Sequence, residues 1–242
     1  MLKLLVAASG SKANSTVIIQ DSDAIVIDCG TTYKALCEAL CSVGLSPKNI
    51  RAVFVTHSHS DHTKGLATLK NKVSAPFYSA VDIDGCQKIN TSVTVGQMSV
   101  SHFDCCHDVD CVGYKICYGK KSVAVATDTG KVTEAMLSQF VGCDAVMLEC
   151  NHDIPMLKAG PYPAALKSRI LSDCGHLSNA DCADVITYLA SNGTKKAVLA
   201  HISETNNTPL VARAEVLLKL KKYGLDKNID VTCAGPLTQI EI

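Results

Sequence analysis

Three histidines and one aspartate lie within six residues of one another, at His57, His59, Asp61 and His62. They follow the apolar run 52–55, which predicts a buried strand. Side chains alternate along an extended segment, so His57 and His59 point to one side and can bind one metal ion. Asp61 and His62 come where the chain turns and can serve a second ion. The alternative is a solvated polar loop, but this spacing favours a metal site.

Single polar residues follow other apolar runs in the same way. They are Asp28, Asp128, Glu149 and His201, each directly after a predicted strand. Side chains placed beyond strand ends are typical of α/β proteins, in which loops on a sheet scaffold build the site.

The hydrophobic pattern predicts the elements that must position these residues. Strands are expected at 2–8, 16–20, 24–28, 52–55, 76–79, 92–95, 98–102, 112–118, 122–127, 145–149, 196–200, 229–233 and 238–242. Helices are expected at 65–70, 133–140, 161–171, 179–191 and 209–223, and one more begins at Thr31 or Thr32 and stops at Gly44. No repeat or linker interrupts the chain, so we expect a single domain over residues 1–242.

The composition is that of an ordinary globular protein, with 47% hydrophobic and 19% charged residues in 242. A formal net charge of zero gives no global sign of nucleic-acid binding, although a local basic patch is compatible with it. No run approaches the roughly 18 apolar residues of a membrane span, and the apolar N-terminus is too short for a signal peptide. We therefore expect a cytoplasmic protein without a membrane partner.

Thirteen cysteines are present, without a C-x-x-C pair. In a chain without a secretory signal, most are expected to be reduced and to pack as small apolar residues. Cys105, Cys106 and Cys150 lie beside candidate site residues, but a redox or metal role for them is the less favoured interpretation.

Residues 57–62, with the sequence HSHSDH, resemble the H-x-H-x-D-H motif of metallo-β-lactamase-fold hydrolases. Further segments resemble the WalJ/YycJ subfamily of that fold nearly from end to end: 9–14, 107–114, 127–130, 149–153, 160–163, 175–179 and 201–207. The resemblance implies an α/β fold of the αββα type, a four-layer sandwich of two mixed β-sheets flanked by helices, with the site along one edge. Members are described as double-stranded DNA 5′-to-3′ exonucleases, associated in some bacteria with two-component signalling.

The resemblance also implies a division of ligands between two divalent ions, Zn²⁺ or Mn²⁺. One ion is expected at His57, His59 and His107; the other at Asp61, His62 and His201; Asp128 is expected to bridge them. Two ions about 3.5–4 Å apart can activate a bridging water. His102 is the alternative to His107 as the ligand. Asp108 and the V-G-Y segment at 112–114 favour His107.

Two residues are expected to support ligands without binding metal. Asp28 is expected to orient a ligand loop. His152 either bonds near Glu149 or simply packs.

His176 lies in the segment Gly-His-Leu-Ser-Asn, which is similar to a Gly-His-Ser-Thr segment of tRNA 3′-processing relatives. There the histidine is paired with a glutamate and protonates the leaving oxygen, and Glu149 matches that glutamate. His176 and Glu149, together with Asp61, are therefore the catalytic candidates. The alternative for a lone histidine is a polar residue bonded to backbone.

Substrate contacts are expected from residues that neighbour these motifs. The candidates are Ser178, Asn179, Asn206, Asn207, Lys167 and Arg169. The favoured function is a dinuclear phosphodiesterase or exonuclease that acts on double-stranded DNA through a metal-bridged hydroxide. The alternatives are a small-substrate hydrolase of thioesterase or lactamase type, and a signalling partner with a purely structural metal site.

Overall fold

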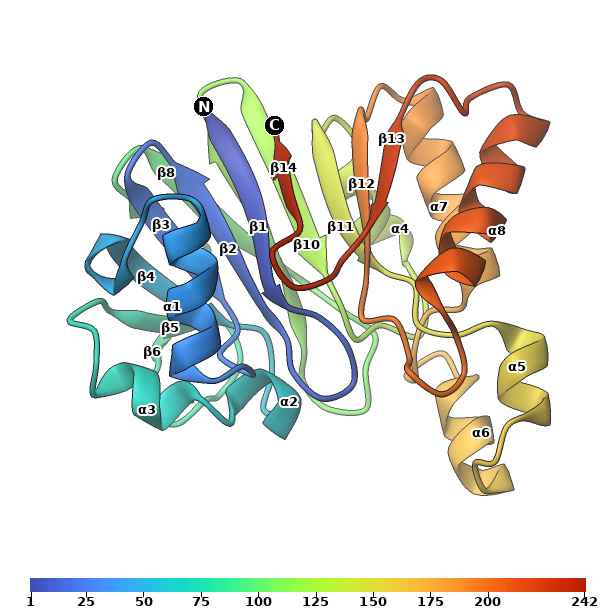
Figure 1. Cartoon of the computed structure of the whole chain (residues 1–242), viewed down its shortest axis with the longest axis horizontal. Helices are drawn as coiled ribbons and strands as arrows, with labels where there is room; N and C mark the ends of the chain where they lie inside the picture. The colour runs from blue at the N-terminus through green and yellow to red at the C-terminus, as the bar shows by residue number, and fades with distance from the viewer.

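The computed structural model describes residues 1–242 as two seven-stranded sheets packed face to face (Figure 1). The first sheet runs β14 (Gln239–Glu241), β1 (Leu2–Ala8), β2 (Ser15–Gln20), β3 (Asp23–Ile27), β4 (Ile50–Val55), β5 (Phe77–Ser79), β6 (Gln87–Lys88). The second runs β13 (Asp230–Cys233), β12 (Lys196–Ala200), β11 (Ala145–Glu149), β10 (Lys121–Ala126), β9 (Val112–Tyr118), β8 (Met98–Asp104), β7 (Ser92–Val95). Each sheet contains both parallel and antiparallel pairs.

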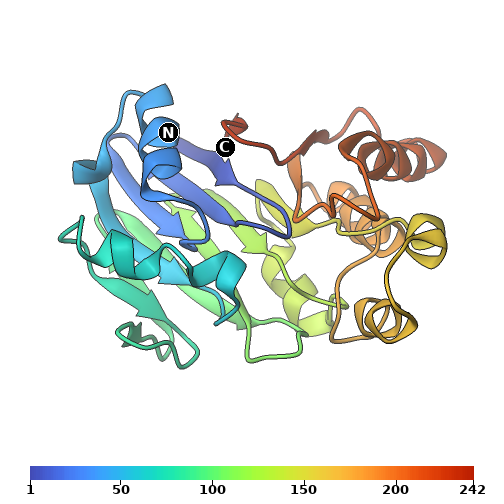
Figure 2. The same ribbon diagram turned by 60° about the horizontal axis from the view of Figure 1, so that its bottom comes forward.

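Helices cover the outer faces of both sheets. On the first side lie α1 (Tyr33–Ser42), a 3₁₀ turn (Pro47–Asn49), α2 (Ser60–Thr63) and α3 (Leu66–Lys70). On the second side lie α4 (Glu134–Phe140), α7 (Asn179–Ser191) and α8 (Pro209–Lys222). The two remaining helices, α5 (Ile154–Ala159) and α6 (Ala164–Ile170), project beyond the layers in both ribbon views (Figure 2). The expected αββα four-layer sandwich is confirmed.

Three apolar clusters correspond to the three interfaces between layers. The central cluster joins side chains of both sheets, and Phe54 of β4 meets Tyr114 of β9 edge to face at 5.4 Å between ring centroids. The Tyr114 hydroxyl donates a 2.7 Å hydrogen bond to the carbonyl oxygen of Val55, the last residue of β4. This bond fixes the end of β4 against the second sheet, two residues before His57.

Four helices begin at a capping hydroxyl, as predicted for α1 and α7. The side chains of Thr32, Thr133, Ser178 and Thr208 each accept a backbone N–H three residues on. Helix α7 has the predicted bounds 179–191. None of the helices is long and apolar enough to cross a membrane.

Other bounds differ from those predicted, for local reasons. The helix expected at 161–171 begins only at Ala164, because Pro163 lies at its N-cap with an extended ψ of 150°. Helix α5 was not predicted, although Asp153 caps it and a proline occupies its first turn. Helix α2 and the two-residue strand β6 are too short for a periodic signal.

Candidate metal centre

The predicted metal-binding residues meet where strands of both sheets end. Strand β4 leads to His57, β10 to Asp128 and β12 to His201. Three residues at such ends have left-handed backbones: Asp28 (φ 63°), Asp128 (φ 58°) and His201 (φ 52°). Aspartate and histidine are among the few non-glycine types that adopt this conformation with any frequency. Asp128 and His201 enter the groups of candidate ligands from such turns.

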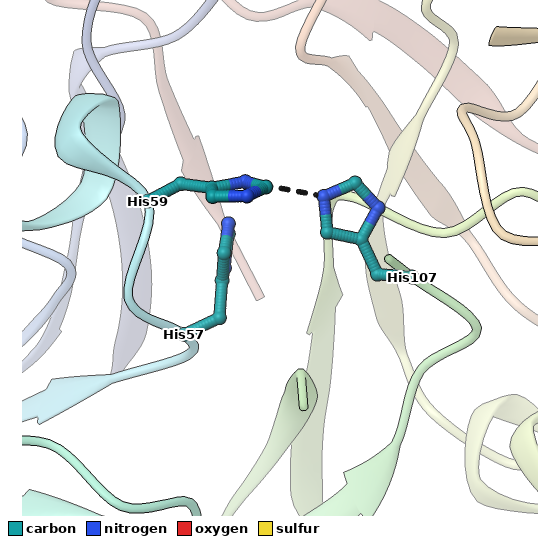
Figure 3. Close-up of side chains that lie close together, drawn as sticks. All are labelled: His57, His59 and His107. Atoms are coloured by element: carbon teal, nitrogen blue, oxygen red, sulfur yellow. Dashed lines mark hydrogen bonds between the residues drawn. The ribbon is translucent and has the colours of Figure 1, made fainter. Parts of the chain in front are cut away.

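The first group comprises His57, His59 and His107, with one nitrogen of each within 4.8 Å of the others. Figure 3 shows the three rings converging from two separate loops. His107 Nε2 lies 3.3 Å from His59 Nδ1. His57 is fully buried, and its Nε2 has no hydrogen-bond partner.

The second group comprises Asp61, His62 and His201, again within 4.8 Å of one another. His62 Nε2 is 3.3 Å from Asp61 Oδ2, and His201 Nε2 is 3.5 Å from the same oxygen. Asp128 lies between the two groups. Its Oδ2 is 3.0 Å from His62 Nε2, and its Oδ1 is 3.9 Å from His107 Nε2.

The buried carboxylate of Asp28 orients two of these rings. Its Oδ2 accepts a 2.7 Å hydrogen bond from His62 Nδ1. It also accepts the Thr56 hydroxyl at 3.0 Å, and that hydroxyl lies 2.9 Å from His57 Nδ1. Because a carboxylate only accepts, His62 carries a proton on Nδ1 and its lone pair on Nε2. The Thr56 hydroxyl donates its own proton to Asp28, so its oxygen accepts from Nδ1–H of His57, which leaves the lone pair of this ring on Nε2 as well. Asp28 therefore holds His57 and His62 in the tautomer that binds metal through Nε2.

Glu149 performs the same task on the other side of the site. Its Oε1 lies 2.8 Å from both His176 Nδ1 and His201 Nδ1. Its Oε2 accepts the backbone N–H groups of Thr129 at 2.8 Å and Leu177 at 3.3 Å. The carboxylate is wholly buried. His201 is thereby left with a free Nε2 toward Asp128, and His176 is fixed beside it.

Burial and neighbouring charges shift the pKa values of the buried groups at the site. Burial alone would raise the pKa of Glu149, but the charges and hydrogen bonds of His176 and His201 lower this pKa to about 2. Burial opposes a charge on His201, yet Asp128, Asp61 and Glu149 raise its pKa to about 10. Burial, followed by the neighbouring charge of His62, lowers the pKa of His57 to about 3.

Comparison with known proteins places the chain in a family. Residues 9–85 match the model of the metallo-β-lactamase superfamily. Exodeoxyribonuclease WalJ of Streptococcus pneumoniae serotype 2 is 31% identical over 263 residues, covering 98% of each chain. Exodeoxyribonuclease YycJ of Bacillus anthracis is 33% identical over 253 residues, covering 97% of this chain and 96% of its own. The chain belongs to the WalJ/YycJ family.

Solved structures agree on the fold of this family member. The metallo-β-lactamase fold protein YhfI from Bacillus subtilis superposes with a TM-score of 0.73 at 16% identity, with both chains fully covered. Human tRNase Z, short form, superposes with a TM-score of 0.67 at 16% identity, covering 99% of each chain. Together with the family model and the curated relatives, this identifies the protein as a metal-dependent hydrolase of the metallo-β-lactamase superfamily.

The residues of this family member fit the divalent metals that the fold implies. Buried atoms without a hydrogen-bond partner include Nε2 of His57, Nε2 of His201 and Oδ2 of Asp128, all of which face the cluster. Leaving such atoms unpaired costs free energy, which a bound cation removes. Imidazole nitrogens and carboxylate oxygens suit ions such as Zn²⁺ and Mn²⁺.

Several predicted substrate contacts lie buried and engaged within the protein. Ser178 caps α7. Asn179 and Asn207 bond one another at 2.7 and 3.1 Å, and Asn207 also donates to the carbonyl oxygens of Cys150 and Asn151. Asn206 is 1% exposed. The side chains of Ser178, Asn179 and Asn207 support the loops around His176 and His201, whereas Asn206 Oδ1 is buried without a hydrogen-bond partner. The burial of these four residues gives no support to the predicted phosphate contacts.

The other predicted residues are placed as follows. Lys167 bonds the carbonyl oxygen of Lys158, whereas Arg169 pairs with Asp108 next to His107. His152 is buried and neither ring nitrogen has a partner, so it packs and does not bond Glu149. His102 lies on β8 outside the clusters, and His107 lies within them.

Some residues around the centre were not singled out from the sequence. Asn14 donates to Asp61 Oδ2 at 3.0 Å and lies 3.0 Å from His62 Nε2. Cys111 Sγ lies 3.6 Å from His57 Nδ1. Two features of the sequence could have indicated such residues. Asn14 lies in the family-like segment 9–14, and Thr56 directly precedes His57.

Proposed function

We propose that this protein is an exodeoxyribonuclease that digests double-stranded DNA from the 5′ end. The observation that carries the proposal is the pair of Glu149 and His176 beside the clustered metal-binding residues. A phosphodiester has an alkoxide leaving group that gains from protonation, and a positioned general acid contributes about 10²–10⁴-fold. The curated relatives, which share nearly the full length of the chain, are named exodeoxyribonucleases.

His176 has the properties of that acid. Its Nδ1–H donates to Glu149 Oε1 at 2.8 Å, so Nε2 carries the second proton of the imidazolium ring. Although burial favours the neutral ring, the charge of Glu149 and the hydrogen bond to it raise the pKa of His176. The ring is 21% exposed, whereas Glu149 is fully buried, so the proton is accessible to a substrate oxygen.

The remaining predicted residues hold the two ions. We assign His57, His59 and His107 to one ion, Asp61, His62 and His201 to the other, and Asp128 to both. Bound divalent ions supply an activated water and neutralise charge on the phosphoryl oxygens. Asp28 and Glu149 keep the ligand rings in the required tautomer, and Arg169 offers a positive charge at the edge of the site.

The proposal is tested with end-labelled duplex DNA, single-stranded DNA and RNA, with Mn²⁺ or Zn²⁺ added to metal-stripped protein. Bis(p-nitrophenyl) phosphate and a thioester serve as small substrates, and the variant D128N serves as the inactive control. We expect 5′-mononucleotides to be released from the 5′ end of duplex DNA, and the release to stop with chelator. Rapid thioester hydrolysis without cleavage of any nucleic acid would establish the small-substrate alternative instead.

A further inference from the structure

A small cavity of about 180 Å³ opens beside His176, on the side of the projecting helices. Its apolar wall consists of Tyr162, Leu166 and Ile170, from α6 and the segment before it. Cavities for whole drug-sized ligands hold about 300–1,000 Å³. This one is therefore suited to a single ring system and is too small for a base pair.

The polar side of the cavity is built from residues next to His201. Ser203 is 5% exposed, and its oxygen accepts the backbone N–H groups of Thr205 and Asn206 at 3.3 and 3.1 Å. Its own hydroxyl proton remains available to a ligand. Asn151, also 5% exposed, lines the same side while its Nδ2 donates to the carbonyl oxygen of His201 at 2.9 Å, and Arg169, paired with Asp108, lines the cavity as well.

The segment that carries Tyr162 is rigid. Tyr162 stands between Pro161 and Pro163, whose rings restrict the backbone φ angles. The residue is half-buried and lines the cavity. At Gly175, a side chain would lie 2.2 Å from the carbonyl oxygen of Arg169, so α6 packs directly on the loop that holds His176. The cavity wall and the proton donor are thus held at a fixed separation.

We propose that this cavity, defined by Tyr162, Leu166, Ile170, Asn151 and Ser203, binds the 5′-terminal nucleoside of the digested strand. The assignment rests on the proposed exonuclease function. In 5′-to-3′ digestion the leaving atom is the 3′ oxygen of the terminal nucleotide, which must lie at His176. The nucleoside attached to that oxygen therefore occupies the adjacent cavity. Its base stacks on Tyr162, and Ser203 and Asn151 face its polar groups.

The size of the cavity has a consequence for duplex substrates. Because it admits one base and not a pair, the terminal base pair must open before cleavage. Opening requires less free energy at a mismatch than at a matched pair. We expect the first cleavage to be faster on duplexes with a terminal mismatch than on the same duplex with a terminal G·C pair.

The test is a double-mutant cycle between Tyr162 and the terminal base. Wild type and the variant Y162L are compared on 3′-labelled duplexes whose 5′-terminal nucleotide is unpaired and is either normal or abasic, so that no base pair has to open in either substrate. Stacking of one base on an aromatic side chain corresponds to about 5- to 150-fold in affinity. We expect kcat/KM to fall by about tenfold or more when either partner is changed, and to fall little further when both are changed.

Two controls accompany the cycle. Y162F retains the ring and should behave as wild type. Y188A removes an exposed tyrosine of α7, 47% exposed and absent from the cavity, and should leave digestion unchanged. Additive losses in the cycle, or equal losses in Y162F and Y162L, would overturn the assignment.

Binding of thymidine 5′-monophosphate, measured by calorimetry, separates this proposal from the proposed function. The metal-loaded wild type should bind it, and Y162L should bind it at least about tenfold more weakly. This outcome supports the cavity assignment even if the wild-type protein does not digest DNA. Failure to digest DNA would refute only the proposed exonuclease function. Equal affinity in wild type and Y162L, or no binding to either, would overturn the cavity assignment.

Discussion

Glu149 accepts hydrogen bonds from two imidazoles with different predicted tasks, the metal ligand His201 and the proton donor His176. The two tasks are separable because only His176 lacks a place among the assigned ligands.

Replacing His176 by alanine should leave metal content unchanged and lower kcat on DNA by about 10²–10⁴, the usual contribution of a general acid. The loss should shrink on bis(p-nitrophenyl) phosphate, because nitrophenolate leaves without protonation. Kinetics on both substrates, with metal analysis of the same preparations, measures this. Metal loss would make His176 a ligand, and an equal rate loss on both substrates would exclude the acid role.

The variant E149Q should be more damaging than H176A. An amide in place of the carboxylate removes the charge that holds both rings and directs an N–H group at other donors. We therefore expect both a fall in kcat and weaker metal binding at the His201 side, measured by metal titration. E134Q, at an exposed glutamate in the first turn of α4, is the matched control. Normal metal affinity in E149Q would mean that His201 does not depend on Glu149.

Asp128 is predicted to touch both ions, so D128A should reduce the metal content of both sites together. Its Oδ2 lies 3.0 Å from Nε2 of His62, in one ligand group, and its Oδ1 lies 3.9 Å from Nε2 of His107, in the other. Elemental analysis after dialysis checks the prediction, with D226A at an exposed aspartate as control. Retention of one full equivalent with normal affinity would remove Asp128 from one site.

At the scale of elements, the short helix α2 is locked against the loop after β3. A side chain at Gly30 would lie 1.5 Å from the carbonyl oxygen of Asp61, and the backbone N–H of Asn14 bonds that same oxygen at 2.8 Å. Three loops are thus joined at the start of α2, which carries Asp61 and His62. No side chain larger than hydrogen fits there without moving the ligands.

We therefore expect G30A to lower both the free energy of unfolding and the metal affinity. Overpacking of a tight contact costs about 1–3 kcal/mol. G235A is a suitable control, since a side chain there would meet only Thr238 Oγ1 at 3.7 Å. Urea unfolding and metal titration of both variants measure the effect. Wild-type behaviour of G30A would show that the loops adjust freely.

Features that depend on neighbouring residues in the chain were predictable from the sequence, and features that depend on distant residues were not. Strand ends and capped helices were predictable, because alternation, β-branched runs and a capping hydroxyl are local signals. Helix α7 was predicted to the residue for that reason. The bonds of Asn14 and the shared role of Glu149 were not predictable, because they join segments far apart in the chain. The burial of Ser178 and Asn207 was not predictable either, because a short motif carries no information on burial.

At the scale of the whole molecule, the metal centre lies across the two sheets. His57 and His62 follow β4 of the first sheet, whereas Asp128 and His201 follow β10 and β12 of the second. Each ion is thus predicted to draw ligands from both sheets, and binding should favour the fully assembled fold. That the chain acts as one domain, in the cytoplasm and in connection with a signalling system, stays a prediction.

Metal should consequently raise the melting temperature. A ligand at a hundredfold excess over its Kd stabilises the folded state by about 2.7 kcal/mol. For a chain of this size that corresponds to a rise in Tm of about 5–10 °C. Thermal melts of stripped protein with increasing Mn²⁺ or Zn²⁺ check this, and D128A should show a smaller rise. An unchanged Tm would mean that the ions do not connect the sheets.

The position of α5 and α6 outside the four layers has a bearing on evolvability. The predicted ligands lie on loops at strand ends, where an insertion would displace several of them at once. The segment 154–170 lies between β11 and the His176 loop, and it supplies one wall of the cavity without supplying a predicted metal ligand. Selection can therefore remodel the part of this segment before Arg169, by insertion or recombination, while the metal ligands and the contact of Arg169 and Ile170 with the His176 loop are kept. Chimaeras that exchange it between relatives would reveal how one lineage acquires new substrates.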